Sequence, residues 1–155
     1  MTERITILDT TLRDGAQREG ISLSANDKIR IAQRLDDLGV AYIEGGWPGS
    51  NPKDVEFFAR ARHLRLQHAR IAAFCSTRHP SAKVEEDRNL QAVLEAGART
   101  AVMVAKSSAM HVEQVLGITR EENLAMIRES VQLLVDRGLE VLFDAEHYFD
   151  GYALD

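Results

Sequence analysis

A cluster of side chains able to bind metal and anions follows a short apolar run near the start of the chain. The sequence LDTTLRDGAQREG at residues 8–20 places Arg13, Asp14 and Gln17 within five residues. Asp14 can supply a carboxylate oxygen to Mg²⁺ or Mn²⁺. Arg13 can bind a carboxylate or a developing enolate with paired donors, and Gln17 can orient a water or a substrate oxygen. The same residues could instead form a solvated turn, and their types alone leave both interpretations open.

The elements that would position these side chains alternate between short β-rich runs and amphipathic stretches. We expect strands near residues 5–8, 41–44, 69–74, 100–104 and 140–143. We expect helices near residues 25–38, 52–62, 87–95 and 120–137. Three junctions of helix, glycine and strand, DLGVAYIE, EAGARTAVM and DRGLEVLF, are typical of βα units in a parallel sheet. Ligands of such folds bind at the carboxyl ends of the strands.

All five expected strands end in polar residues, whereas their starts carry little beyond ordinary turn residues. Beyond the first cluster, the candidates at these ends are Glu44, Cys75, Thr77, Arg78, His79, Lys106, Asp144, Glu146 and His147. Glu146 could act as acid or base if burial raised its pKa toward neutrality. Glu44 could be functional or could simply pair with Arg13. Cys75 is more typical of a small buried hydrophobe than of a nucleophile.

Five βα units in this order could form an open doubly wound sheet or the first part of a (β/α)₈ barrel. A complete barrel takes about 250 residues, whereas this chain has 155. The expected fold is therefore α/β, with parallel βα units that form the first five-eighths or so of a TIM barrel. Such a wall leaves a strand edge and one face uncovered, so we expect a homo-oligomer.

Composition excludes several other classes of protein. The net charge is −5 and the acids and bases are interspersed, so no nucleic-acid partner is expected. No apolar run approaches the roughly 20 residues that span a bilayer, so no membrane partner is expected. A single cysteine, Cys75, provides no disulfide framework. These features fit a cytoplasmic protein.

Four segments together resemble a known enzyme family. DTTLRDGAQ, IEGGWPGSNPKD, FCSTR and FDAEHYFDGY are similar to the N-terminal part of the catalytic barrel of the isopropylmalate, homocitrate and citramalate synthases. These enzymes belong to the DRE-TIM metallolyase superfamily, together with hydroxymethylglutaryl-CoA lyase and the pyruvate carboxyltransferases. The resemblance covers residues 1–155, and IEGGWPGSNPKD is most like the citramalate synthase branch.

The resemblance implies a Claisen-type condensation of acetyl-CoA with a 2-keto acid, pyruvate or 2-oxoisovalerate, in branched-chain amino-acid biosynthesis. The implied cofactor is a divalent metal, Mg²⁺, Mn²⁺ or Zn²⁺, with acetyl-CoA as co-substrate. In the resemblance, Asp14 matches the metal ligand and Arg13 matches the arginine that stabilises the oxyanion. Gln17 matches the nearby glutamine of the same motif. Glu44 matches the acid that supports the arginine, and Glu146 matches the catalytic glutamate. Thr77 and Arg78 lie in the segment where the family selects its keto acid.

The chain departs from this family in its remaining metal ligands. The family uses a His-x-His pair late in the barrel, and this sequence contains no H-x-H. It also lacks the last three strands, the linker subdomain and the regulatory domain. We therefore expect a fragment of a longer enzyme that holds metal weakly and turns over little alone. The alternatives are an acyl-CoA lyase of the same superfamily and a non-catalytic, self-associating half-barrel.

Overall fold

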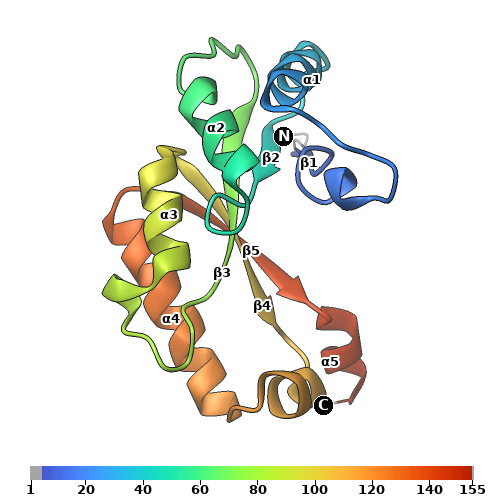
Figure 1. Cartoon of the computed structure of the whole chain (residues 1–155). Helices are drawn as coiled ribbons and strands as arrows, with labels where there is room; N and C mark the ends of the chain where they lie inside the picture. Colours follow the sequence, from blue (N-terminus) through green and yellow to red (C-terminus); the bar gives the residue numbers. More distant parts are fainter. Residues whose placement is uncertain (1–4, 155) are drawn as a thin grey trace, which may run out of the picture.

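The structure is a curled, five-stranded parallel sheet with helices along its outer face (Figure 1). The computed structural model describes residues 5–154. In chain order and in sheet order, the strands are β1 (Leu8–Asp9), β2 (Tyr42–Gly46), β3 (Arg70–Ser76), β4 (Thr100–Lys106) and β5 (Glu140–Glu146). Sequential parallel order is that of a barrel wall, because a doubly wound sheet reverses its order at a switch point. The predicted barrel fragment is therefore confirmed.

The helices begin and end at residues suited to those positions. They are α1 (Ala25–Asp37), α2 (Pro52–Ala61), α3 (Arg88–Ala96), α4 (Arg120–Asp136) and α5 (Tyr148–Leu154). Ser24 and Asp27 form a capping box at the start of α1, and Gly97, with a φ of 72°, ends α3. The first four helices match their predicted bounds within one residue at each end. No helix was predicted at α5.

The first strand is shorter and later than predicted. It begins at Leu8, which pairs with Tyr42 at the start of β2. Ile5 and Ile7 are exposed. Because β1 is an edge strand and its neighbour in the described sheet starts at Tyr42, residues 5–7 have no facing residue of β2 with which to pair. The predicted strand began too early because the prediction relied on β-rich composition alone.

The two faces of the sheet pack against different surroundings. On the outer face, Ala73, Met103 and their neighbours form the main core with the helices. On the inner face, a smaller cluster forms around Phe74 and Val102. Side chains alternate between the faces along each strand. The alternation therefore sends the helix-packing residues outward and the remaining residues of each strand toward the barrel interior.

The far edge of the sheet is uncovered. Among the described strands, β5 pairs only with β4, and Phe143 on β5 is 47% exposed. Phe149 and Tyr152 on the adjoining α5 are 82% and 77% exposed. Open strand edges and apolar patches favour association with another chain. The expected homo-oligomer stays a prediction. Within residues 5–154, no helix combines the length and apolar character that a membrane span requires.

Asp36, near the end of α1, anchors the loop that leads into β3. Its carboxylate accepts hydrogen bonds from the backbone N–H groups of Gln67, His68 and Ala69 at 2.8, 2.8 and 2.7 Å. Burial raises the pKa of Asp36, but the three N–H donors together bring it below its ordinary value. The ionised carboxylate therefore stabilises this loop.

We expect Asp36→Ala to lower the free energy of unfolding by about 2 kcal/mol near pH 7, because three backbone donors lose their acceptor. The folded pKa lies below the unfolded value of about 3.9. The contribution is therefore complete above that value and is lost as pH falls through the folded pKa. Urea unfolding at pH 7 and pH 3 should show the deficit shrinking in acid. Exposed Asp37 provides the matched control, and a deficit independent of pH would contradict this assignment.

Candidate active site

Arg13 is held over the inner face of the sheet by two neighbours. Its Nε donates to Glu44 Oε2 at 2.7 Å, and its guanidinium lies 4.0 Å from the centre of the Phe74 ring. The Glu44 side chain is only 1% exposed. Burial raises the pKa of Glu44, the Arg13 hydrogen bond and charge oppose that rise, and the carboxylates of Asp144 and Asp14 add to it. A buried carboxylate and an aromatic face therefore orient one cation at the strand ends.

The loop after β1 turns tightly and leaves its ligand candidates accessible. The Thr10 carbonyl accepts hydrogen bonds from the backbone N–H groups of Arg13 and Gly15, both at 3.1 Å. The Asp14 side chain is 66% exposed and lies 3.3 Å from Arg13 Nη1, measured from its Oδ1. Gln17 is also exposed. The loop thus presents a carboxylate and an amide to solvent beside the oriented guanidinium.

A buried ion pair holds the loop after β2. Lys28 and Asp54 are each 4% exposed and form a salt bridge. Lys28 Nζ also donates to the Gly45 carbonyl at 3.1 Å, and Asp54 accepts from the Trp47 N–H at 2.8 Å. Gly46 has a φ of 147°, and a Cβ there would collide with the Asp54 carboxylate. Gly46, the last residue of β2, therefore permits the close approach of Asp54.

Trp47 packs against one of the residues that hold Arg13. Its Nε1 donates to Asn89 Oδ1 at 2.5 Å, and Asn89 Nδ2 donates to the Ser76 carbonyl at 3.0 Å. The indole meets the Phe74 ring edge to face, with 5.2 Å between the ring centres. Trp47 therefore packs against the ring that carries the Arg13 guanidinium. These contacts give Trp47 a packing role.

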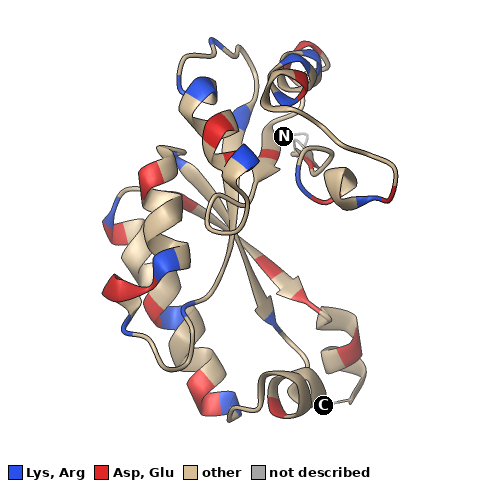
Figure 2. Cartoon of the chain, viewed as in Figure 1, with Lys and Arg blue, Asp and Glu red and all other residues tan. Residues whose placement is uncertain are grey.

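The ends of β4 and β5 carry opposite charges. Lys106 faces Glu146 in the register, and its Nζ lies 2.5 Å from Glu146 Oε2. Acidic segments near the end of β5 accordingly lie beside a basic segment at the end of β4 (Figure 2). The Glu146 side chain is 41% exposed. The carboxylate is therefore partly open to solvent, and its role as acid or base stays a prediction.

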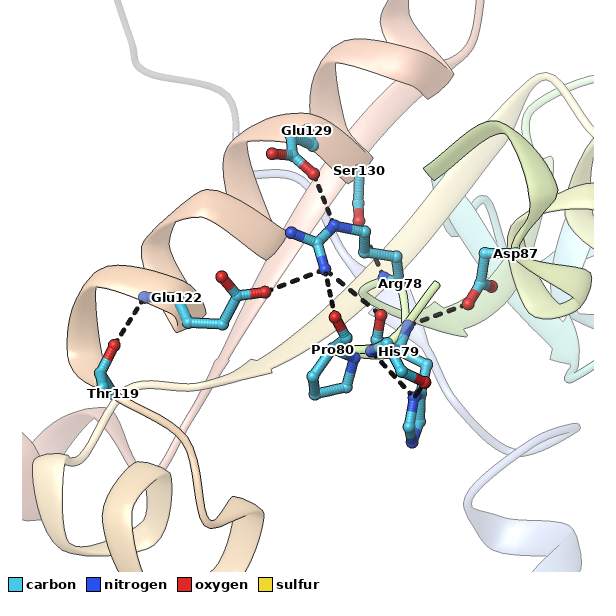
Figure 3. A network of polar contacts seen from close by, with 9 residues as sticks. Arg78, His79, Pro80, Asp87, Thr119, Glu122, Glu129 and Ser130 are labelled. Carbon is cyan, nitrogen blue, oxygen red and sulfur yellow. Dashed lines mark hydrogen bonds and ion pairs between the residues drawn. The ribbon is translucent and has the colours of Figure 1, made fainter. Parts of the chain in front are cut away.

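Arg78 turns toward α4. Its Nε lies 2.5 Å from Glu129 Oε2 and its Nη1 lies 3.0 Å from Glu122 Oε1, while its backbone N–H donates to Ser130 Oγ at 2.9 Å (Figure 3). The side chain is 8% exposed. Substrate contact by Arg78 stays a prediction that this geometry does not favour. Neighbouring Thr77 is half-buried and stays a candidate for substrate selectivity.

We expect Arg78→Met to lower the free energy of unfolding by about 1–2 kcal/mol, because it removes several hydrogen bonds to partly exposed carboxylates. It should leave the affinity for a keto acid unchanged, since the guanidinium is engaged by Glu122 and Glu129. Urea unfolding and calorimetric titration of pyruvate with Mn²⁺ measure the two effects. Arg128→Met, at an exposed position of α4, is the control. A Kd for pyruvate raised tenfold or more in Arg78→Met alone, on the order of 1.4 kcal/mol, would establish the substrate contact.

Cys75 is part of the core. It is fully buried, and burial raises the pKa of its thiol to about 12. A protonated, enclosed thiol does not act as a nucleophile near neutral pH. The interpretation of Cys75 as a small buried hydrophobe is therefore confirmed. His79 is exposed, and its Nδ1 lies 2.8 Å from Ser81 Oγ.

The metal ligands present here are incomplete. Among the described residues, no three His, Cys, Asp or Glu side chains gather in a way that could hold a metal ion. Asp14 offers one exposed carboxylate, which suits a hard cation such as Mg²⁺ or Mn²⁺. One such ligand binds these ions weakly unless other groups join it. Asp14 thus fits part of a metal site.

Comparison with known proteins identifies the family. A family model described as HMGL-like matches residues 4–151. The chain belongs to the HMGL-like family. Among solved structures, this HMGL-like chain resembles the HMG-CoA lyase of Bacillus subtilis, with a TM-score of 0.68 and 22% identity over 92% of the chain and 46% of that structure. The hydroxymethylglutaryl-CoA lyase of Pseudomonas aeruginosa gives a TM-score of 0.69 with 21% identity over 90% of the chain and 45% of that structure. These likenesses support the barrel-wall fold.

Curated relatives are closer in sequence. The HMGL-like chain is 56% identical to the (R)-citramalate synthase of Synechocystis sp. over 94% of its length, which is 27% of that relative. It is 54% identical to the (R)-citramalate synthase of Streptomyces coelicolor, with 94% and 28% coverage. The 2-isopropylmalate synthase of Sulfolobus acidocaldarius is 37% identical, with 94% and 36% coverage. The chain thus spans about a quarter to a third of each of these relatives, and the resemblance read from its motifs is confirmed.

Proposed function

We propose that this chain is the N-terminal part of a catalytic barrel that condenses acetyl-CoA with a 2-keto acid. The observation that carries the proposal is the Arg13–Glu44 pair beside exposed Asp14, in a chain more than half identical to citramalate synthases. The lower identity of 37% to a 2-isopropylmalate synthase favours pyruvate over 2-oxoisovalerate as the keto acid. The product would then be citramalate, in branched-chain amino-acid biosynthesis.

In this proposal, Asp14 holds Mg²⁺ or Mn²⁺ through its carboxylate. When bound, the ion supplies Lewis-acid polarisation and a template for the keto acid. Arg13 stabilises the negative charge that develops on the keto oxygen, because Glu44 and Phe74 keep its guanidinium oriented there. Exposed Gln17 orients a water or a substrate oxygen next to it.

Glu146 is the proposed base for the acetyl group. Its carboxylate accepts a methyl proton of acetyl-CoA, and the resulting carbanion forms a bond to the keto carbon. The keto oxygen becomes an alkoxide beside Arg13 and takes a proton from water, while Glu146 returns its proton to solvent. Water hydrolyses the thioester and releases free coenzyme A thiol. Lys106 keeps the Glu146 carboxylate at the strand ends through the 2.5 Å ion pair.

We place the remaining metal ligands and barrel strands in a longer protein, because this chain spans 27% of the first citramalate synthase described above. In that complete protein, Asp14→Asn should abolish Mn²⁺-dependent binding of pyruvate, measured by calorimetric titration. Glu19→Gln, at an exposed position of the same loop, should leave binding intact. Equal pyruvate affinity in Asp14→Asn and the parent protein would overturn the assignment of Asp14.

A further inference from the structure

His147 adopts a backbone conformation that side chains rarely tolerate. Among the described residues, it is the one non-glycine residue with a positive φ, at 62°. Such a conformation persists only where the surrounding structure determines it. His147 directly follows Glu146, the last residue of β5, and precedes α5. The left-handed residue therefore lies at the junction where β5 ends, directly beside Glu146.

A second imidazole holds His147 in place. The rings of His111 and His147 stack with 3.7 Å between their centres and 7° between their planes. His147 Nδ1 also lies 3.3 Å from Asp150 Oδ2, and its carbonyl accepts from the Gly151 N–H at 2.9 Å. The stack spans two segments, because His111 follows β4 whereas His147 follows β5. The left-handed conformation thus depends on contacts from both sides.

The two segments are locked together at the level of Glu146. The Ser107 N–H donates to the Glu146 carbonyl at 2.9 Å, which extends the β4–β5 ladder by one step. Gly151 is buried, and a Cβ there would collide with the Ser107 carbonyl. His111 begins the short π-helix His111–Leu116, and its Nδ1 is buried with no hydrogen-bond partner among residues 5–154. The ring stack is the contact that joins His111 to the end of β5.

We propose that His111 is a positioning residue for Glu146 and acts through His147. The inference rests on the proposed function, because it names what orients the carboxylate of that same site. Glu146 Oε2 lies 2.5 Å from Lys106 Nζ, and Oε1 lies 3.9 Å from His147 Nε2. The carboxylate therefore sits between a lysine and the stacked imidazole. Loss of the stack releases the backbone at His147 and shifts this carboxylate.

Turnover of three variants in the complete protein tests the proposal. With Mn²⁺ and varied pyruvate and acetyl-CoA, His111→Ala should lower kcat by about 10–100-fold, since a misplacement on the order of 1 Å has that effect. KM should stay nearly unchanged, because His111 does not contact substrate in this proposal. His111→Phe keeps a flat ring and should retain kcat and the shape of the pH profile. Equal losses in both variants, or no loss in His111→Ala, would overturn the proposal.

A third variant keeps the proposal testable if His111→Ala fails to fold. Glycine adopts a φ of 62° without steric cost, so His147→Gly should fold while losing the stack. Its kcat should fall as in His111→Ala, and an unchanged kcat would overturn the proposal. Gln114→Ala, at an exposed position of the same π-helix, is the control and should behave as the parent protein.

Nuclear magnetic resonance of this chain separates the inference from the proposed function. His111→Ala should move the backbone amide resonances of Glu146 and His147 and remove the ring-current shift of the His147 ring, whereas His111→Phe should preserve both. If the complete parent protein releases no thiol, the proposed function has failed and these resonances alone decide the inference. Unmoved Glu146 and His147 amides in His111→Ala would overturn it.

Discussion

Replacing Arg13 with alanine is expected to lower the free energy of unfolding by about 3–5 kcal/mol at pH 7, because it leaves a buried carboxylate without its cation. Glu44 is 1% exposed, and its carboxylate forms a salt bridge with Arg13. The same change should abolish turnover in the complete protein. Urea unfolding measures the first effect, and thiol release from acetyl-CoA measures the second.

The pH dependence of this deficit follows from Glu44. Burial raises its pKa, so the stability that Glu44 contributes is complete below its ordinary pKa and is lost as pH rises through the raised value. Arg13 lowers that pKa, so its removal should make the loss larger. The deficit of Arg13→Ala should therefore widen between pH 4 and pH 7.

Two further variants complete the Arg13 experiment. Adding Glu44→Gln to Arg13→Ala should recover most of the lost stability, because a neutral amide replaces the unpaired charge. Arg18→Ala, at an exposed position of the same loop, should have little effect. A deficit below about 1 kcal/mol for Arg13→Ala, typical of a surface pair, would contradict the account of a buried partnership.

Asp54→Ala is the second change with a large expected effect. It should cost about 3–5 kcal/mol of unfolding free energy, because the buried Lys28 ammonium would lose its carboxylate. Lys28 would keep the Gly45 carbonyl at 3.1 Å, while the Trp47 N–H would lose its acceptor. Trp47 is the single tryptophan of the chain, so its fluorescence reports the loop directly. Its emission should shift to longer wavelength as the loop loosens.

The matched variants for Asp54 separate charge burial from packing. The pair Lys28→Met with Asp54→Leu replaces both charges by apolar groups and should recover much of the stability. Lys53→Ala, at an exposed position beside Asp54 on α2, should behave as the parent chain. If the apolar pair is as unstable as Asp54→Ala, the unpaired charge is not the cause.

Local patterns predicted the elements well. The helix, glycine and strand junctions, together with caps such as Ser24, placed four helices within one residue of their observed bounds at each end. These signals are local, so the sequence carries them directly. β1 began later than predicted because its extent depends on where β2 offers a partner. Segment α5 packs through Gly151 against Ser107, a contact that no local pattern announces.

The candidate site was predictable only where the strand ends themselves carry charge. Arg13 follows β1 and Glu44 lies in the neighbouring β2, so their pairing could be anticipated and is observed. The ring of Phe74 beneath Arg13 depends on the register between strands, which the periodicity of one strand does not determine. The stack of His111 on His147 depends on two turns meeting in space. The direction taken by Arg78 after β3 likewise depends on α4.

Thiol release from acetyl-CoA by the complete protein, with Mn²⁺ and either pyruvate or 2-oxoisovalerate, tests the central claim most directly. The account predicts release with pyruvate, weaker release with 2-oxoisovalerate, and none in Arg13→Ala. The 155-residue chain, assayed alongside, should release little thiol, because the carboxylate proposed to hold the metal, Asp14, is exposed. No release with either keto acid from a folded, metal-loaded complete protein would contradict the account.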